Sequence, residues 1–299
     1  MSSISTLAPG LNMTEHIYGP SPVKRLRSTS GEMAKVEASL YNIVLAQKPM
    51  TVRQCYYRAT VAGLIDKTEA GYKRVQRILA DMRRAGRMPY SWLTDSSRTV
   101  YQRDCFDGPQ EAAEATARFY RKALWTNAHC RVEVWLEKDA LSGVLYRVTD
   151  DYDVGLYVTR GFSSLSFLHV AAENIASRNI PTFIYHLGDR DPSGVMAGTK
   201  IEETLRHLAP EAEIHFTRLA VTEQQIAEMR LPSRPTKAST HARGWVGASV
   251  ELDAIEPDTL RAIVREAIER HLPAHEWRIL KAAEQSERQQ LWQWAGAAA

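Results

Sequence analysis

Cysteine is scarce in this sequence, with three residues among 299: Cys55, Cys105 and Cys130. Their number is odd, and their spacing matches neither a disulfide framework nor the CxxC pairs of a structural zinc site. The class of small secreted proteins that depend on disulfides is therefore excluded, and we expect a reducing, cytoplasmic setting.

Long apolar runs are also missing. No uninterrupted apolar segment is long enough to cross a bilayer, and the N-terminal stretch MSSISTLAPGLNMTEH lacks the basic and then apolar pattern of a secretory signal. With 44% apolar and 24% charged residues, the composition is typical of a soluble globular protein. We therefore expect no membrane partner.

The net charge of the whole chain is only +3, but it is unevenly distributed. Residues 1–110 contain 16 Lys and Arg against 9 Asp and Glu, a net charge of +7, while residues 111–299 contain 22 against 26, a net charge of −4. This division indicates a polyanion-binding module joined to a module that uses carboxylates. Solvated helix faces and chance would produce the same asymmetry, so charge alone leaves both explanations open.

Helical spacing dominates the first third of the chain. Residues 1–28 are rich in Ser, Pro and Gly and predict a flexible arm with a small basic cluster. Apolar residues at helical spacing predict a first helix over 32–47, which Pro49 ends. Thr51 is a good N-cap for a second helix, and a third, amphipathic helix is predicted over 71–87.

The third helix is basic, and residues 88–102 after it have the pattern of a turn and a strand. Three short helices followed by an extended segment fit a winged-helix DNA-binding domain over 29–110. Its DNA contacts would come from the basic side chains of the third helix, Lys73, Arg74, Arg77, Arg83 and Arg84. A solvated surface helix has the same composition, so this feature alone does not decide between the two.

The pattern changes after a polar segment, 111–128, that predicts a linker helix. From residue 129 to residue 299, strand-like runs alternate with helical segments, which is typical of a parallel sheet flanked by helices. We therefore expect an α/β fold, α+β overall, with a C-terminal helical extension. The strand-like runs are RVEVWLE, DVGLYVT, TFIYHLGD and EIHFTRLA, at 131–137, 153–159, 182–189 and 213–220.

Carboxylates follow two of these runs. Glu137 ends the first, while Asp189 and Asp191 lie in the turn GDRDPSG that ends the third. Because ligands of an open parallel sheet bind beyond the carboxyl ends of its strands, we expect the three carboxylates to converge there. Carboxylates are hard oxygen ligands, suited to Mg²⁺ and not to zinc. Each piece alone also has a simpler explanation, as turn chemistry for the aspartates or as a surface ion pair of Glu137 and Lys138.

Two adjacent tyrosines stand in the second helix, in the stretch VRQCYYRAT. Helical phase places Tyr56 with Val52 and Cys55 on the buried stripe, and Tyr57 with Arg53 on the opposite, polar face. Tyr56 is therefore predicted to pack in the core, and Tyr57 to face outward, where Arg53 would help it to meet a phosphate. A surface tyrosine without chemical function is the ordinary explanation of such a residue, but the carboxylates downstream favour a catalytic role.

These motifs together resemble a known family. Glu137-Lys138 after a first strand, and DRDPSG after a later one, resemble a Toprim domain, the fold shared by topoisomerases, primases and some nucleases. The basic helices and the Arg53-x3-Tyr57 spacing resemble more specifically the A subunit of type IIB DNA topoisomerase (topoisomerase VI) and the related meiotic double-strand-break transesterases. YVTRGFSS is similar to a Gly-rich segment of that family, with Arg160 in place of the usual lysine, and ELDAIEPDTL resembles its C-terminal region more loosely.

The resemblance implies a DNA topoisomerase-like enzyme that cuts double-stranded DNA as a homodimer. Tyr57, assisted by Arg53, would form a phosphotyrosyl bond to a DNA 5′ end, using the metal site of the other protomer. Glu137 would act near the scissile phosphodiester and hold Mg²⁺ together with Asp189 and Asp191. Strand passage would require a separate ATPase B-type subunit, because this sequence has no Gly-rich nucleotide-binding loop.

Two alternatives to a transesterase are also considered. In a hydrolytic Toprim nuclease, a metal-activated water would attack the phosphodiester, and Tyr57 would be structural. In a catalytically inactive DNA-binding module, only salt-sensitive binding to duplex DNA would remain.

Overall fold

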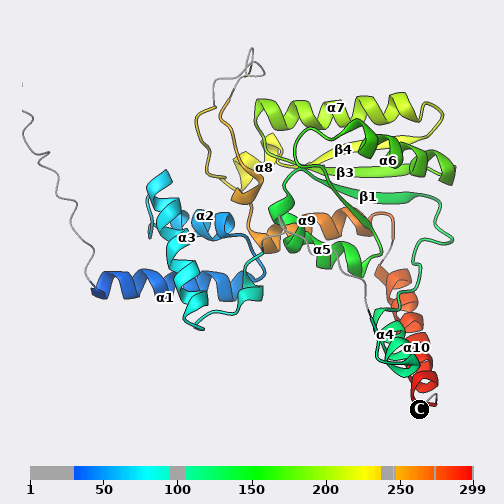
Figure 1. Cartoon of the computed structure of the whole chain (residues 1–299). Coiled ribbons are helices and arrows are strands. Elements are labelled where there is room, and N and C mark those ends of the chain that lie inside the picture. Colours follow the sequence, from blue (N-terminus) through cyan, green and yellow to red (C-terminus); the bar gives the residue numbers. More distant parts are fainter. Residues whose placement is uncertain (1–29, 95–104, 237–244, 246, 273, 298–299) are drawn as a thin grey trace, which may run out of the picture.

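A computed structural model describes residues 30–94, 105–236, 245, 247–272 and 274–297 (Figure 1). The predicted arm, 1–28, lies outside the described residues. Among the helices that are described, none combines the length and the apolar character needed to span a bilayer.

Three helices form the first part of the fold: α1 (Ser30–Gln47), α2 (Val52–Val61) and α3 (Glu69–Arg84). They confirm the three predicted helices. Thr51 caps α2 as predicted, because its hydroxyl accepts a hydrogen bond from the Gln54 N–H at 3.0 Å and the Gln54 side chain accepts one from the Thr51 N–H at 2.9 Å. The three helices enclose one apolar cluster, to which α3 contributes its predicted face, Val75, Ile78, Leu79 and Met82.

The segment after α3 differs from the predicted wing in its described part. Residues 88–94 contain a short 3-10 helix, η1 (Tyr90–Trp92), and then a single parallel bridge between Leu93 and Met50. The bridge is the only strand-like pairing there because the chain turns back at η1 toward the start of α2. The rest of the predicted strand, 95–102, lies outside the described residues.

A four-stranded parallel sheet forms the second part of the fold and confirms the α/β class. Its strands are β1 (Arg131–Leu136), β2 (Gly155–Val158), β3 (Thr182–Leu187) and β4 (Ile214–Ala220). All neighbours are parallel, in the order β2-β1-β3-β4, so β1 and β3 lie side by side at the centre. The carboxyl ends of the four strands therefore meet at one edge of the sheet.

Helices cover both faces of the sheet (Figure 1). On one face, α6 (Leu165–Arg178) and α7 (Pro192–Leu208) pack over inward-facing side chains such as Trp135 and Ile184. On the other face, α5 (Ser142–Asp151) and α9 (Pro257–Glu269) pack over Val134 and its neighbours. Successive side chains of β1 and β3 point to opposite faces of the sheet, and helices cover both faces. These two strands are therefore buried on both sides, and their sequences are largely apolar.

The remaining described elements are short, or lie at the far end of the molecule. They are η2 (Asp139–Leu141), α8 (Glu223–Glu228) and η4 (Leu252–Ala254). The predicted linker, 111–128, overlaps α4 (Pro109–Phe119), which packs against the C-terminal helix α10 (Ala274–Ala297). The side chains of Tyr120 and Lys122 both bond to Glu287 of α10, each at 2.6 Å. These two helices project away from the sheet (Figure 1).

Candidate functional site

Two of the predicted site residues meet at the carboxyl edge of the sheet. Since β1 and β3 are adjacent and parallel, the residues that follow them, Glu137 and Asp189, become neighbours. The Asp189 N–H donates to the Glu137 carboxylate at 2.9 Å. The sequence-based placement of this pair is confirmed.

Glycines of the following turn make room for Glu137. A Cβ atom at Gly188 would lie 2.5 Å from Glu137 Oε2, and one at Gly194 would lie 2.9 Å from the same oxygen. Both positions therefore require glycine for this packing. Burial, and then the nearby Asp189 carboxylate, raise the pKa of Glu137 above its ordinary value.

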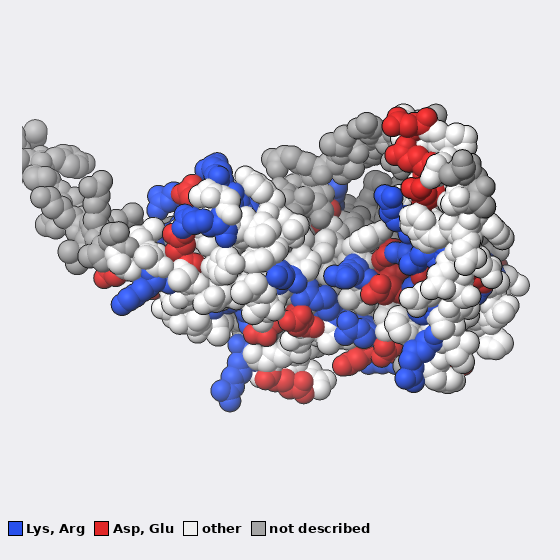
Figure 2. Space-filling view, turned by 90° about the horizontal axis from the view of Figure 1, so that it is seen from below, with Lys and Arg blue, Asp and Glu red and all other residues white. Residues whose placement is uncertain are grey.

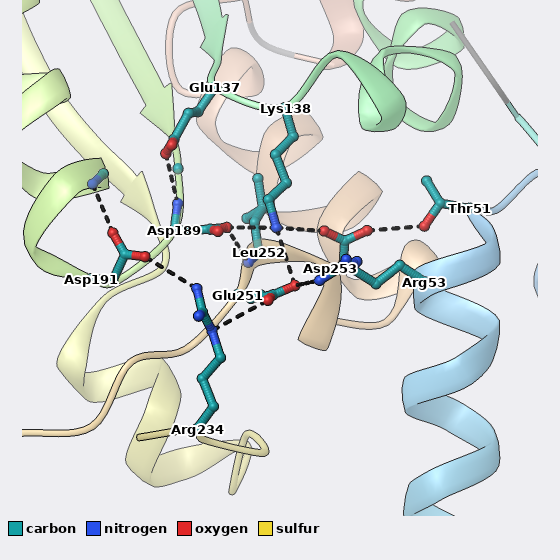
Figure 3. Close-up of polar contacts among 12 residues, drawn as sticks. Thr51, Arg53, Glu137, Lys138, Asp189, Asp191, Arg234, Glu251, Leu252 and Asp253 are labelled. Carbon is teal, nitrogen blue, oxygen red and sulfur yellow. Dashed lines mark hydrogen bonds and ion pairs between the residues drawn. The ribbon is translucent and has the colours of Figure 1, made fainter. Parts of the chain in front are cut away.

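Asp191 does not join the other two carboxylates. One of its oxygens accepts the Gly194 N–H at 2.8 Å and caps α7, and the other lies 3.2 Å from the Arg234 guanidinium (Figure 3). Pro192 follows it at the first position of the helix, where a missing N–H costs nothing. Asp191 therefore makes no direct contact with Glu137 or Asp189, although its charge contributes to the raised pKa of Glu137, so the three predicted carboxylates lie within electrostatic range of one another but do not form a direct cluster.

The number of carboxylates that lie close together decides how the predicted Mg²⁺ ion could be held. Within the described residues, no group of three or more Asp, Glu, His or Cys side chains is placed to hold a metal ion. The Glu137 Oε1 and Asp189 Oδ2 atoms accept no hydrogen bond from a described residue, so each carboxylate keeps one oxygen for another ligand. Two hard oxygens fit Mg²⁺, which binds through one or two carboxylates and takes other ligands from water and phosphate.

Lys138 occupies the centre of a second carboxylate cluster. Its Nζ lies 2.9 Å from Asp189, 2.7 Å from Asp253 and 3.4 Å from Glu251 (Figure 3). Burial alone would lower the pKa of Lys138, but the three carboxylates outweigh it and hold the pKa well above its ordinary value. Lys138 is therefore a permanent cation next to Asp189, which also accepts the Leu252 N–H at 2.8 Å.

Glu251 and Asp253 were not predicted as site residues, although both lie in ELDAIEPDTL, the segment noted above for its loose resemblance. Both belong to the stretch VELDA around η4 and are buried, with exposed fractions of 7% and 2%. The available signal was the alternation of acidic and apolar residues, which is unusual in a segment that is otherwise buried. It was weak because no predicted strand precedes these residues.

The start of α2 docks on this cluster from the opposite direction. The Thr51 hydroxyl donates to Asp253 at 2.9 Å, and the Arg53 guanidinium pairs with Glu251 at 2.5 Å (Figure 3). These contacts join residues about 200 positions apart, with separations of 202 and 198. The start of the tyrosine helix and the sheet edge therefore lie together within a single chain, which differs from the expectation that Tyr57 uses the metal site of the other protomer.

Tyr57 is buried, with an exposed fraction of 4%, so its predicted outward orientation is wrong. Helical phase assumed a single buried face, but α2 is covered on both sides. Tyr57 itself packs in the apolar cluster of the first three helices, with its ring centroid 5.5 Å from that of Tyr56, while Arg53 on the same helix reaches Glu251 next to η4. The Tyr57 hydroxyl makes no hydrogen bond to a described residue. Burial, and then the charge of Glu251, raise the pKa of Tyr57, while Arg53 and Lys138 oppose that shift.

Tyr56 is confirmed as a packing residue. Its exposed fraction is 7%, and its ring meets the Tyr72 ring edge-on at 5.4 Å. Its hydroxyl donates to the Thr68 carbonyl at 3.2 Å, which satisfies the polar end of the side chain. Unlike Tyr57, it has no unused hydroxyl near the carboxylates.

The five basic residues predicted to contact DNA do not share one face of α3. Lys73, Arg77 and Arg84 are exposed, whereas Arg74 and Arg83 are half-buried. Lys73 and Arg84 make intrahelical ion pairs, and Arg74 donates to the Met33 sulfur at 3.2 Å. The face of the molecule in Figure 2 has Lys and Arg side chains interspersed with Asp and Glu. DNA binding by α3 stays a prediction.

Comparison with known proteins adds no relative. No model of a protein family matches the chain, and no curated protein matches its sequence.

Proposed function

We propose that this protein is a Mg²⁺-assisted DNA-cleaving transesterase of the topoisomerase VI A type, with Tyr57 as its nucleophile. The observation that carries the proposal is the Tyr57 hydroxyl, which has no hydrogen-bond partner among the described residues. The Lys67 Nζ lies 5.8 Å from the centroid of the Tyr57 ring, and Arg53 and Lys138 oppose the rise of the Tyr57 pKa that burial and Glu251 cause. The same sheet edge carries Glu137 and Asp189, which supports phosphoryl-transfer chemistry there.

In the proposed step, the Tyr57 oxygen attacks a phosphodiester phosphorus. A bond forms between that oxygen and phosphorus, and the bond to the 3′ oxygen of the neighbouring nucleotide breaks. The phenol proton is lost, and the departing 3′ oxygen takes up a proton. Arg53 and Lys138 are suited to offset the negative charge that develops on the phosphate. Because water does not take part, the bond energy is kept in the phosphotyrosine and the step is reversible.

The phenol requires activation. An ordinary tyrosine has a pKa near 10, and burial beside Glu251 raises the pKa of Tyr57 further. Mg²⁺ bound to Glu137 and Asp189 would supply positive charge at the reacting phosphate. Asp191 would join these ligands only after release from Arg234, with which it pairs at 3.2 Å. The proposal therefore expects rearrangement at Arg234 when metal and DNA bind.

The wider assignments belong to the same proposal. The three N-terminal helices would act as a winged-helix domain, and the parallel sheet with its flanking helices as a Toprim domain. Double-strand cleavage would require two copies of the chain, one for each strand. Any ATP-driven strand passage would depend on a separate ATPase subunit.

The first prediction concerns the covalent product. With end-labelled duplex DNA and Mg²⁺, we expect label to remain on the denatured wild-type protein and to vanish in Tyr57→Phe. Tyr56→Phe is the matched control, since it removes the adjacent hydroxyl, which bonds to Thr68 and not to the site. Retention of the label in both variants would contradict the assignment.

A second candidate, a hydrolytic nuclease, is favoured by the burial of Tyr57. A phenol with a raised pKa is a poor nucleophile, and a metal-activated water would bypass it. This candidate predicts free 5′-phosphate ends without protein-bound label, and loss of cleavage in Asp189→Asn but not in Tyr57→Phe. If no divalent metal supports cleavage while duplex binding persists, the chain is a DNA-binding module.

A further inference from the structure

A groove of about 580 Å³ lies between α3 and the carboxyl edge of the sheet. One wall is formed by Tyr72, Gln76 and Arg83 of α3, and the facing wall includes Lys138 and Asp189. The inference that follows rests on the proposed function, because it concerns which nucleic acid this groove takes and which residues hold it.

The polar residues of α3 fall into two rows. Tyr72, Gln76 and Arg83 are spaced by four and seven residues and face the groove. Lys73, Arg77 and Arg84 have the same spacing one position later and are all exposed. Since one residue corresponds to about 100° of rotation around the helix, the second row lies to the side of the first, and none of its residues lines the groove. The basic residues that the sequence groups together therefore serve different surfaces.

The charges in the groove make Arg83 its most available cation. Arg53 is paired with Glu251, and Lys138 with Asp189 and two other carboxylates. Arg83 donates to the Leu79 carbonyl at 3.3 Å and lies 5.5 Å from the Tyr90 ring centroid. No ion pair with a carboxylate is found for Arg83 among the described residues. Its guanidinium is therefore available to a phosphate or a base.

The groove is too small for a duplex but suits part of one strand. Its volume is that of an ordinary small-molecule pocket, roughly 300–1,000 Å³. The Gln76 amide and the Arg83 guanidinium are groups that bond to or stack on unpaired bases. Between them and the sheet edge, the Tyr72 ring forms the aromatic part of the wall, with its centroid 5.1 Å from the Arg53 guanidinium carbon and 5.4 Å from the Tyr56 ring centroid. The side chains of the wall and the volume of the groove are therefore both consistent with binding part of a single strand.

We propose that this groove binds an unpaired stretch of the DNA strand next to the reacting phosphate, through Tyr72, Gln76 and Arg83. The exposed row, Lys73, Arg77 and Arg84, contacts duplex phosphates only. Four carboxylates line the groove against three cations, so the strand enters it more readily when a divalent cation is present. The groove row, and not the exposed row, then distinguishes single-stranded from duplex DNA.

Fluorescence anisotropy of the full chain tests this assignment. Tyr57→Phe serves as the background, so that no adduct forms, with a labelled single-stranded oligonucleotide or its duplex and with or without Mg²⁺. We expect Arg83→Gln to weaken single-strand binding roughly tenfold or more, as stacked contacts to bases require. The matched Arg77→Gln is expected to weaken it by about twofold and to act mainly on the duplex. Mg²⁺ is expected to strengthen single-strand binding.

A second variant guards against misfolding. Gln76 is exposed, so Gln76→Glu places a negative charge on the groove wall without changing its shape, and it is expected to weaken single-strand binding with an unchanged circular dichroism spectrum. Equal effects of Arg83→Gln and Arg77→Gln, or no effect of Gln76→Glu, overturn the groove assignment whatever the covalent assay gives. Selective groove effects without any Tyr57 adduct overturn the proposed function and leave the groove in place.

Discussion

His186 is a fully buried histidine directly behind the candidate site. It lies on β3, and its ring faces Gly188 and Gly198 and lies near Phe216, with ring centroids 5.6 Å apart. Neither ring nitrogen has a hydrogen-bond partner among the described residues. Burial, together with the nearby Arg218 guanidinium, lowers the pKa of His186 to about 3. The folded protein therefore keeps this ring neutral.

A pH-dependent loss of stability follows from His186. An unfolded histidine titrates near pH 6.5, so below that pH the unfolded chain binds a proton that the folded chain refuses. This contribution is absent above about pH 7 and grows as pH falls from 6.5 toward 3, reaching roughly 2 kcal/mol at about pH 5. We expect His186→Leu to remove it, as measured by urea unfolding at two pH values. The exposed His207→Leu is the control, and an unchanged pH dependence in His186→Leu would refute the prediction.

At the residue level, the sequence predicted which residues lie in the candidate site better than it predicted the burial and orientation of their side chains. Glu137 and Asp189 were correctly placed together, because both follow adjacent parallel strands. Tyr56 is confirmed as a packing residue, but Tyr57 is buried in the same apolar cluster, so the predicted contrast between a buried and an outward tyrosine is wrong. Periodicity describes one helix against one core, and it carries no information on a second surface that covers the opposite face. The sequence around Asp191 is ambiguous, because an Asp-Pro pair fits a metal ligand in a turn and also the N-cap of a helix, which Asp191 provides for α7.

At the scale of elements, α2 is held by its N-cap more firmly than an ordinary helix. Thr51 completes a capping box with Gln54 and donates to the buried carboxylate of Asp253 at 2.9 Å. Thr222 makes the same kind of capping box with Gln225 at the start of α8. Beyond this capping box, the Thr222 side chain makes no tertiary hydrogen bond to a described residue. The two threonines thus form a natural comparison.

We expect Thr51→Ala to lower the free energy of unfolding by roughly 2–3 kcal/mol, about 1 from the cap and the rest from the lost hydrogen bond to the buried Asp253 side chain. Thr222→Ala is expected to cost only about 1 kcal/mol, because it loses the cap alone. Urea unfolding of both variants measures the difference. Thr51→Ser keeps the hydroxyl and should restore most of the loss. Equal costs for the two alanine variants would contradict a role for Asp253.

The turn that carries Asp189 is also fixed by an element outside it. Arg218 of β4 donates to the carbonyls of Gly188 and Val221 at 2.8 and 3.1 Å, and to that of Asp189. The sequence predicted the strand but not this contact, because backbone carbonyls leave no residue signal. Local sequence patterns thus predict the strands and helices that carry the site residues. They do not predict the long-range hydrogen bonds, such as those of Arg218, that fix these residues in place.

At the scale of the whole molecule, the N-terminal helices and the sheet have separate apolar clusters. Described contacts between the two parts are mainly polar and join distant segments. Arg58 pairs with Glu256 and donates to the Ala254 carbonyl at 2.8 Å, while Arg261 donates to the carbonyls of Gln47 and Pro49, each at 3.2 Å. Sequence patterns predicted both parts, but contacts about 200 residues apart lie beyond any local pattern.

These arginines are expected to control how firmly the two parts stay together. Arg58 is largely buried, with 14% of its side chain exposed, so Arg58→Met removes the ion pair with Glu256 and leaves the Ala254 carbonyl without its donor. Combined with Arg261→Met, it is expected to separate the two parts in a fraction of molecules. Each part keeps its own apolar cluster, so the helical content should be unchanged. Separation would also remove Tyr57 from Lys138 and reduce adduct formation.

Small-angle scattering and amide hydrogen exchange measure this separation. We expect a larger radius of gyration and faster exchange along α2 and η4 in the double variant. Arg206→Met is the control, because it breaks an exposed pair with Glu202 within α7, and no ion pair of Arg206 with another described element is found. Unchanged scattering and exchange would show that the polar contacts do not hold the parts together. A loss of helical signal along with the separation would instead show that the two parts do not fold independently of their contact, which contradicts the prediction as well.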